Sequence, residues 1–148
     1  MDKVTLKKKI NDLFIVREND GSYNLFGKYT VIPDNNSYKV NVNGETEFLH
    51  FSSLRNAVTW CVFEKNNKYK EIKRIHELDE LISSLNVIIA QHTKLLEKTT
   101  SEDKYIYSAK FAEGKVKKKQ AIKEIEEYAN ISSYWQRKKF SENQDKNI

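Results

Sequence analysis

The chain has 148 residues, a mass of 17.5 kDa and a formal net charge of +5 at pH 7. This length suits one compact unit, because domains commonly run to about 100–200 residues. The one cysteine excludes an intrachain disulfide and a cysteine-based zinc cage, and it favours a reducing compartment. No apolar run approaches the roughly 20 residues of a membrane span, and the first residues lack the apolar region of a secretory signal, so we expect no membrane contact.

Charge and turn residues divide the chain near residue 52. Residues 1–52 carry seven basic and seven acidic side chains, so residues 53–148 carry the whole excess of five. The one proline and three of the four glycines also precede residue 53. This division predicts an α+β fold in three parts. We expect a small antiparallel β-meander covered by one helix (1–66), a long antiparallel, coiled-coil-like helical hairpin (67–140) and a flexible tail (141–148).

The first elements in chain order are a short helix and a set of strands. Apolar positions in residues 2–12 suit a short helix with lysines on its outside. Runs of β-forming residues alternate with turn residues over about 13–51, which predicts three or four strands. A turn at residues 33–36, which contains the proline, separates two hairpins.

The first hairpin is predicted from Asp20-Gly21, which stands between two apolar runs. Such a dipeptide is typical of a two-residue hairpin loop, because both residues tolerate positive φ. This loop pairs Val16 with Leu25. It places four apolar side chains on one face: Phe14, Val16, Tyr23 and Leu25.

The second hairpin contains Asn43-Gly44 and allows two registers. A two-residue loop pairs Tyr38 with Leu49. A three-residue loop, with Gly44 in the left-handed conformation, pairs Tyr38 with Phe48 instead. A shift of one residue moves every side chain to the other face of the sheet, and the apolar pattern favours the three-residue loop.

A helix over residues 53–66 is the predicted cover of the sheet. Ser52 or Ser53 can cap it. Apolar residues recur at helical spacing: Leu54, Ala57, Val58, Cys61 and Val62. We expect Trp60 and Cys61 to pack against the sheet, because a nucleophilic cysteine needs a basic partner that this segment does not supply.

A long helix is predicted from Tyr69 to about Lys98, a length of roughly 45 Å. Its seam residues alternate at spacings of three and four, which is the coiled-coil pattern. They are Ile75, Leu78, Ile82, Leu85, Ile89, His92 and Leu96. The histidine is either a pH-sensitive position or an ordinary core residue.

A second long helix is predicted over about 103–130, and residues 132–140 extend or restart it. The short connection makes the two helices antiparallel neighbours. The expected stripe is Tyr105, Ala109, Ala112, Val116, Ile122, Ile125 and Ala129. Because three of these residues are the small alanines Ala109, Ala112 and Ala129, the hairpin buries little apolar area. We therefore expect a homo-oligomer or a protein partner, against the alternative of a lone hairpin held by the sheet at its base.

Two basic segments suit contact with a nucleic-acid backbone or a protein partner. The first is on the second long helix: Lys115, Lys118, Lys119 and Lys123. The second interleaves aromatic and basic residues near the end of the chain: Trp135, Arg137, Lys138 and Lys139. Such residues can track phosphates and stack on bases without reading sequence. The alternatives are a solvated lysine face for the first segment and an anchor in a core or interface for the second.

Motifs for catalysis, cofactors and metals are missing from the sequence. The three histidines are isolated, and no nucleotide-binding or metal-ligand spacing occurs. The sequence therefore predicts a protein that is not an enzyme, with no cofactor, no metal site and no small-molecule substrate.

Residues 52–63, 74–79 and 90–96 carry a resemblance to a group of small uncharacterised proteins of large T4-like tailed phages of marine bacteria. The likeness spans about residues 23–140 and transfers no catalytic motif. It implies a viral protein of the host cell cytoplasm or the virion, with a structural or assembly role. The predicted function is a non-enzymatic structural or interaction protein that works through its hairpin. The alternatives are a sequence-independent nucleic-acid-binding accessory protein and an inhibitor or modifier of a host enzyme.

Overall fold

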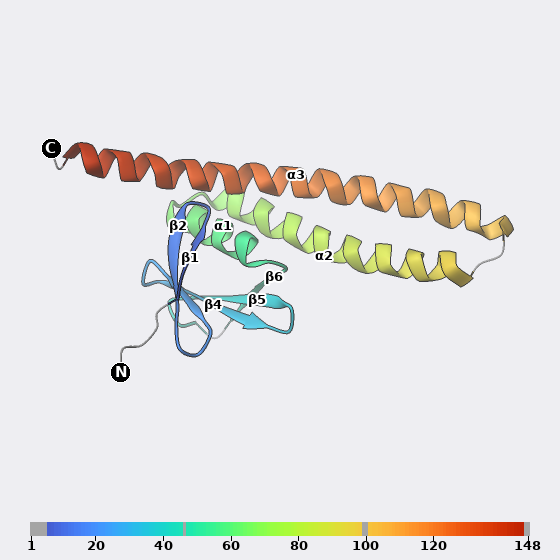
Figure 1. The fold of residues 1–148 in the computed structure, drawn as a ribbon, viewed down its shortest axis with the longest axis horizontal. Helices are drawn as coiled ribbons and strands as arrows, with labels where there is room; N and C mark the ends of the chain where they lie inside the picture. Colours follow the sequence, from blue (N-terminus) through green and yellow to red (C-terminus); the bar gives the residue numbers. More distant parts are fainter. Residues whose placement is uncertain (1–5, 46, 99–100, 147–148) are drawn as a thin grey trace.

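The computed structural model describes residues 6–45, 47–98 and 101–146, and it confirms the α+β fold class. An antiparallel sheet precedes three helices, and the last two form a long hairpin (Figure 1). The sheet is a meander whose strands pair in chain order, but it has six strands where three or four were expected. They are β1 (Leu6–Ile10), β2 (Leu13–Arg17), β3 (Tyr23–Leu25), β4 (Tyr29–Asp34), β5 (Ser37–Val42) and β6 (Leu49–Phe51).

Strand β1 replaces the helix that was expected over residues 2–12, of which residues 2–5 lie outside the described part. It joins β2 through a two-residue turn at Asn11 and Asp12, both at positive φ. Asparagine and aspartate adopt this conformation at low cost. The Asn11 side chain is buried, donates to Thr59 Oγ1 at 2.8 Å and accepts from Arg55 Nε at 3.2 Å. These bonds attach the turn to the helix that covers the sheet.

The first hairpin is one residue out of the predicted register. Arg17 pairs with Tyr23, so the loop spans residues 18–22 instead of two residues. The Asp20 carboxylate accepts from the amide and the hydroxyl of Ser22, at 2.9 and 2.6 Å. This side-chain bond stabilises a longer loop than the Asp-Gly dipeptide alone suggests.

The shift in register changes which of two neighbouring β2 side chains faces the core. Ile15 is 1% exposed and belongs to the core, whereas Phe14, which was expected inside, is 66% exposed. The Lys9 ammonium lies 5.4 Å from the centroid of the Phe14 ring. An aromatic ring and a cation are therefore displayed together on the outer surface of the β1–β2 hairpin.

Neither predicted register of the second hairpin is present. Tyr38 pairs with Phe51, and the loop runs from Asn43 to Phe48. Asn43 and Gly44 both have positive φ, as in a type I′ turn, and the Glu45 amide donates to the Val42 carbonyl. The turn forms where it was predicted, but β5 and β6 pair only from Val40 and Leu49 onward. The turn therefore does not determine the register of the two strands.

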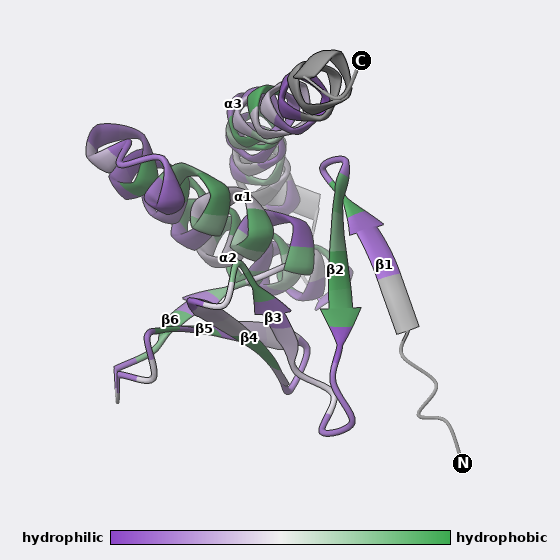
Figure 2. Ribbon diagram, turned by 90° about the vertical axis from the view of Figure 1, so that its left-hand side faces the viewer, coloured by the Kyte–Doolittle hydropathy of each residue, from purple (hydrophilic) through white to green (hydrophobic). Residues whose placement is uncertain are grey.

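Helix α1 (Leu54–Lys65) covers the sheet, as predicted, and lies between the sheet and the helical hairpin (Figure 2). Ser53 caps it, with its hydroxyl accepting from the Asn56 amide at 3.1 Å. Trp60 packs edge-to-face on Tyr29, and Cys61 is fully buried. Burial raises the pKa of the Cys61 thiol, which agrees with its expected packing role.

Helices α2 (Tyr69–Lys98) and α3 (Ser101–Lys146) form the predicted hairpin. The bounds of α2 match the prediction. Helix α3 is continuous through residues 132–140 and reaches Lys146, within the segment where a tail was expected. At its base the hairpin shares one core with the sheet and α1, through Ile75, Leu78 and Ile125 among others. Its other end extends well beyond the sheet (Figure 1).

The seam of α2 is the predicted one. Ile75, Leu78, Ile82 and Leu85 are buried at the base. Farther out the seam is less covered: Ile89, His92 and Leu96 are half-buried. The role of His92 as a pH-sensitive position stays a prediction.

The predicted stripe of α3 is correct only near the base. Ile125 and Ala129 are buried, but four of its members are exposed: Ala109, Ala112, Val116 and Ile122. Tyr105 lies outside the residues whose side chains are described. Gly114 and Lys118 occupy the seam instead, and a Cβ added to Gly114 would lie 3.4 Å from Ile89 Cγ1. The small glycine lets the helices approach, and the aliphatic stem of a lysine can line a seam while its charge stays in water.

Candidate functional site

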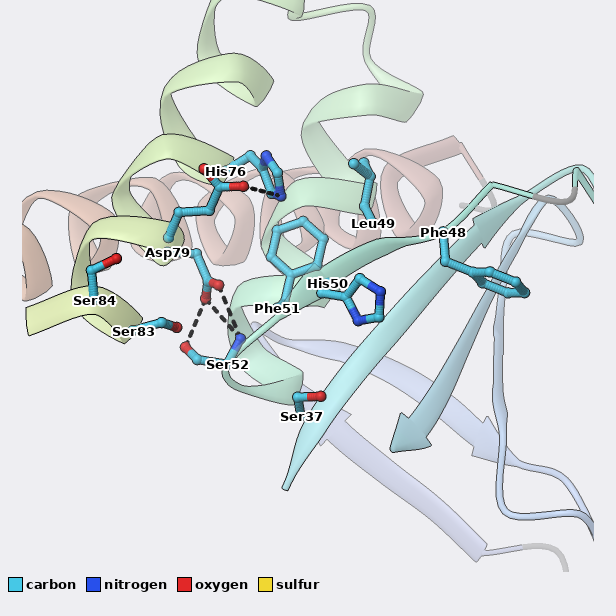
Figure 3. A pocket seen from close by; sticks show the side chains of 11 residues that line it. Ser37, Phe48, Leu49, His50, Phe51, Ser52, His76, Asp79, Ser83 and Ser84 are labelled. Atoms are coloured by element: carbon cyan, nitrogen blue, oxygen red, sulfur yellow. Dashed lines mark hydrogen bonds and ion pairs between the residues drawn. The ribbon is translucent and has the colours of Figure 1, made fainter. Parts of the chain in front are cut away.

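One cleft of about 510 Å³ lies between the sheet edge and α2 (Figure 3). It contains serines, carboxylates and two histidines, which are the residue types of hydrolytic sites. The buried Asp79 carboxylate, however, accepts bonds from three other groups. These are the Ser52 amide at 3.0 and 3.1 Å, the Ser52 hydroxyl at 2.8 Å and Asn56 Nδ2 at 2.7 Å. Asp79 therefore joins α2 to the junction between β6 and α1.

Neither histidine of this cleft is hydrogen-bonded to the Asp79 carboxylate in the described structure. His76 lies 3.5 Å from Glu80 and packs edge-on against Phe51, while His50 is exposed on the strand (Figure 3). In Figure 3 the dashed lines from Asp79 run to Ser52, and the line at His76 runs to Glu80. Within the described part of the chain, no three His, Cys, Asp or Glu residues are grouped as a metal site needs. The hydrogen bonds of Asp79 thus join the sheet unit to the hairpin at this cleft.

A second cleft, of about 560 Å³, brings together three distant parts of the chain. The β1–β2 hairpin forms one wall, the turn after β3 and the end of α1 form another, and the C-terminal part of α3 closes it. We call it the basic cleft. Its lining residues are Lys9, Asp12, Leu13, Phe14, Phe26, Lys65, Gln136, Arg137 and Lys139.

Two cations of the basic cleft share its one carboxylate. Arg137 Nη1 lies 2.6 Å and Lys9 Nζ 3.5 Å from the Asp12 carboxylate oxygens. Burial alone raises the pKa of Asp12, but the hydrogen bonds and charges of Arg137 and Lys9 outweigh it and hold the pKa below its ordinary value. Asp12 therefore stays ionised and fixes the position of Arg137.

The other two cations lie close to each other. Partial burial lowers the pKa of Lys65, and the neighbouring positive charge of Lys139 lowers it further. The Lys65 ammonium also lies 3.8 Å from the centroid of the Phe26 ring. Among residues with described side chains, no ion pair joins Lys65 or Lys139 to a carboxylate. This side of the cleft therefore has uncompensated positive charge.

A smaller hollow of about 220 Å³ continues the basic cleft along α3. It shares Lys65, Gln136 and Lys139 with the cleft and adds Asn66, Trp135 and Lys138. The Trp135 ring packs against Phe63, with their centroids 4.7 Å apart. Of the predicted C-terminal candidates, the basic residues thus line the two hollows, whereas Trp135 anchors the helix in the core.

The predicted lysines in the middle of α3 form a separate patch. Lys115, Lys119 and Lys123 are exposed, and Lys118 is half-buried toward the seam. Lys119 and Arg137 are 18 positions apart on one helix, a rise of roughly 27 Å. The two groups of candidate residues therefore do not form one site.

Sequence reasoning found only Arg137 and Lys139 among the residues that line the basic cleft. Lys9 was assigned to a helix, Phe14 to the core, and Lys65 and Phe26 to no site. Only the correct register of the first hairpin places Phe14 outside, and that register depends on a loop whose length is not evident from the Asp-Gly signal. No motif links these residues, because they meet only in the folded chain.

No protein-family model matches the chain, and comparison with curated proteins and solved structures finds no match either. The resemblance to phage proteins therefore stays a prediction. Across the described ranges, every helix is too short or too polar to cross a lipid bilayer.

Proposed function

We propose that the protein is a non-enzymatic interaction protein whose hairpin associates with the hairpin of a second copy. The observation that supports this is apolar surface on the projecting half of the hairpin, residues 86–98 of α2 and 108–117 of α3. Val87 is 58% exposed, Ile88 is 40% exposed and Val116 is 56% exposed. Isolated apolar side chains are common on protein surfaces, so exposure alone is weak support. The regular spacing of these exposed residues is the stronger support for the proposal.

The exposed apolar residues follow helical spacing on both helices. On α2, Leu81 and Ile88 are seven positions apart and lie beside the buried seam. On α3, Ala109, Ala112 and Val116 are spaced by three and four and point away from the seam. Each helix therefore has one apolar stripe inside the hairpin and one outside it. Helices with two apolar stripes are typical of bundles of more than two strands.

A second copy of the chain is the occupant that this geometry favours. The same outer stripes are present on every copy, so a two-fold contact buries the stripes of both copies at once. The seam of the projecting half is thin, since Gly114 contributes no side chain and Ile89 is only half-buried. Two hairpins together bury more apolar surface per helix than one hairpin does. The phage resemblance supports the same role, as a virion or assembly component.

The test is the molar mass of the pure full-length protein, measured by light scattering after gel filtration. We expect a mass near twice 17.5 kDa at micromolar concentration. A variant with Ile88→Lys and Val116→Lys places two charges in the outer stripes. Its dissociation constant should rise at least about tenfold, because each buried unpaired charge costs more than ~1.4 kcal/mol.

The matched control carries Asn86→Lys and Thr93→Lys, which add the same two charges at exposed positions of the projecting half, on a face of α2 away from Ile88. It should have the mass of the parent protein, and circular dichroism should show equal helix content in all three. A parent protein that is monomeric, or a stripe variant as dimeric as the control, would refute the proposal.

A further inference from the structure

We propose that the basic cleft binds single-stranded nucleic acid, with a phosphate against Lys65 and Lys139 and a base against Phe14. This site lies outside the outer stripes of the hairpin and does not depend on association. Its elements are a pair of cations, an exposed ring and a connected hollow, and each of them suits one part of a nucleotide chain.

The phosphate position follows from charge. The carboxylate of Asp12 is already shared by Arg137 and Lys9, so it offsets one of the two positive charges on that side of the cleft. Lys65 and Lys139 repel each other, and the lowered pKa of Lys65 is one consequence. A phosphate between the two ammonium groups removes this repulsion and supplies an acceptor to both. Lysine binds phosphate as a point charge, without reading sequence.

The base position follows from the exposed ring of Phe14. Its outer face is open to solvent in the described structure, and the adjacent Lys9 ammonium can reach a neighbouring phosphate. A phenylalanine so exposed contributes little to folding, but a base can stack on it whatever its sequence. Phe26 is half-buried and carries the Lys65 ammonium over its ring, so it supports the cation rather than the base.

The length of the basic surface favours a strand over a free nucleotide. The cleft of about 560 Å³ continues into the hollow of about 220 Å³, where Lys138 adds a further cation. Cations thus follow one another from Lys9, across the cleft, to Lys138. A polyanion can contact all of them in turn, whereas a mononucleotide has charge for one end only.

The experiment measures binding of the full-length protein to a fluorescent oligothymidine strand by anisotropy at several salt concentrations. In a variant with Lys65→Gln and Lys139→Gln, the dissociation constant should rise at least about tenfold at low salt. The slope of log K against log salt should fall by about 0.7 for each lost phosphate contact. Phe14→Ala should raise the dissociation constant at least about fivefold and leave the slope unchanged, since stacking involves no counterion.

The matched control removes the same charge elsewhere on α3, by Lys115→Gln and Lys119→Gln, and should bind within about twofold of the parent protein. Three results would overturn the inference: no binding by the parent, equal losses in the two double variants, or equal affinity for duplex of the same length. Competition by thymidine monophosphate as effective as that by the strand would also overturn it and indicate a free-nucleotide site. None of these variants changes the outer stripes of the hairpin. If the protein has the mass of a dimer but does not bind the strand, the nucleic-acid inference is refuted and the proposed association of hairpins is not.

Discussion

Asp79→Ala is expected to lower the free energy of unfolding by about 3–5 kcal/mol. The Asp79 carboxylate is 2% exposed and accepts from Ser52 and Asn56 at distances between 2.7 and 3.1 Å. A hydrogen bond to a charged group contributes about 1.5–3 kcal/mol, and a buried donor left without its partner costs about as much. Ser52 and Asn56 are half-buried, so water takes up part of the loss.

Urea unfolding followed by circular dichroism measures this change. Asp79→Asn keeps the shape and one acceptor oxygen, so it should cost roughly half as much and gives a folded protein to compare. The matched control is Glu80→Ala at the next, exposed position, where we expect a change below about 0.5 kcal/mol. Equal stability of the Asp79→Ala and Glu80→Ala variants would contradict the structural role of Asp79.

Phe63→Ala is expected to cost about 3–5 kcal/mol, as large-to-small changes of buried aromatic residues do. The Phe63 ring is 2% exposed and lies between α1 and α3. Its centroid is 5.5 Å from that of Tyr128 and 4.7 Å from that of Trp135. Removing it leaves a cavity in the contact that holds the C-terminal part of α3 against the sheet unit.

Thermal unfolding and tryptophan emission test the role of Phe63 together. The variant should melt on the order of 10 °C lower, and its emission should shift to longer wavelength as water reaches Trp135. Phe63→Leu fills most of the space and should cost less than about 1.5 kcal/mol. Phe14→Ala serves as the control, because that ring is exposed. A Phe63→Ala variant with unchanged melting and emission would contradict the packing of α1 on α3.

The helices could be predicted because their signals are local. Ser53 caps α1 at the predicted residue, and the alternation of three and four residues from Ile75 to Leu85 describes the observed seam of α2. The pattern of α3 was ambiguous, because the helix has two apolar stripes. Val116 continues the exposed stripe, and Gly114 and Lys118 complete the seam. A sequence pattern treats glycine as a helix breaker and lysine as a surface residue, so neither is expected in a seam.

The strand registers and the basic cleft could not be predicted, because they depend on loop lengths and on contacts between distant residues. The bonds from Ser22 to Asp20 lengthen the first loop and turn Phe14 outward. That one change moves an aromatic ring from the predicted core to the cleft. The meeting of Lys65 with Lys139 then follows from the docking of α3 on α1, which no local pattern describes.

Amide hydrogen exchange at two protein concentrations shows whether a second copy covers the projecting half of the hairpin. Residues 86–98 and 108–117 have a thin seam, so their amides should exchange readily in the monomer. Raising the concentration from about 1 to about 100 µM should slow exchange in these residues and leave β2 to β5 unchanged. Exchange in the hairpin that is independent of concentration would show that no second copy covers it.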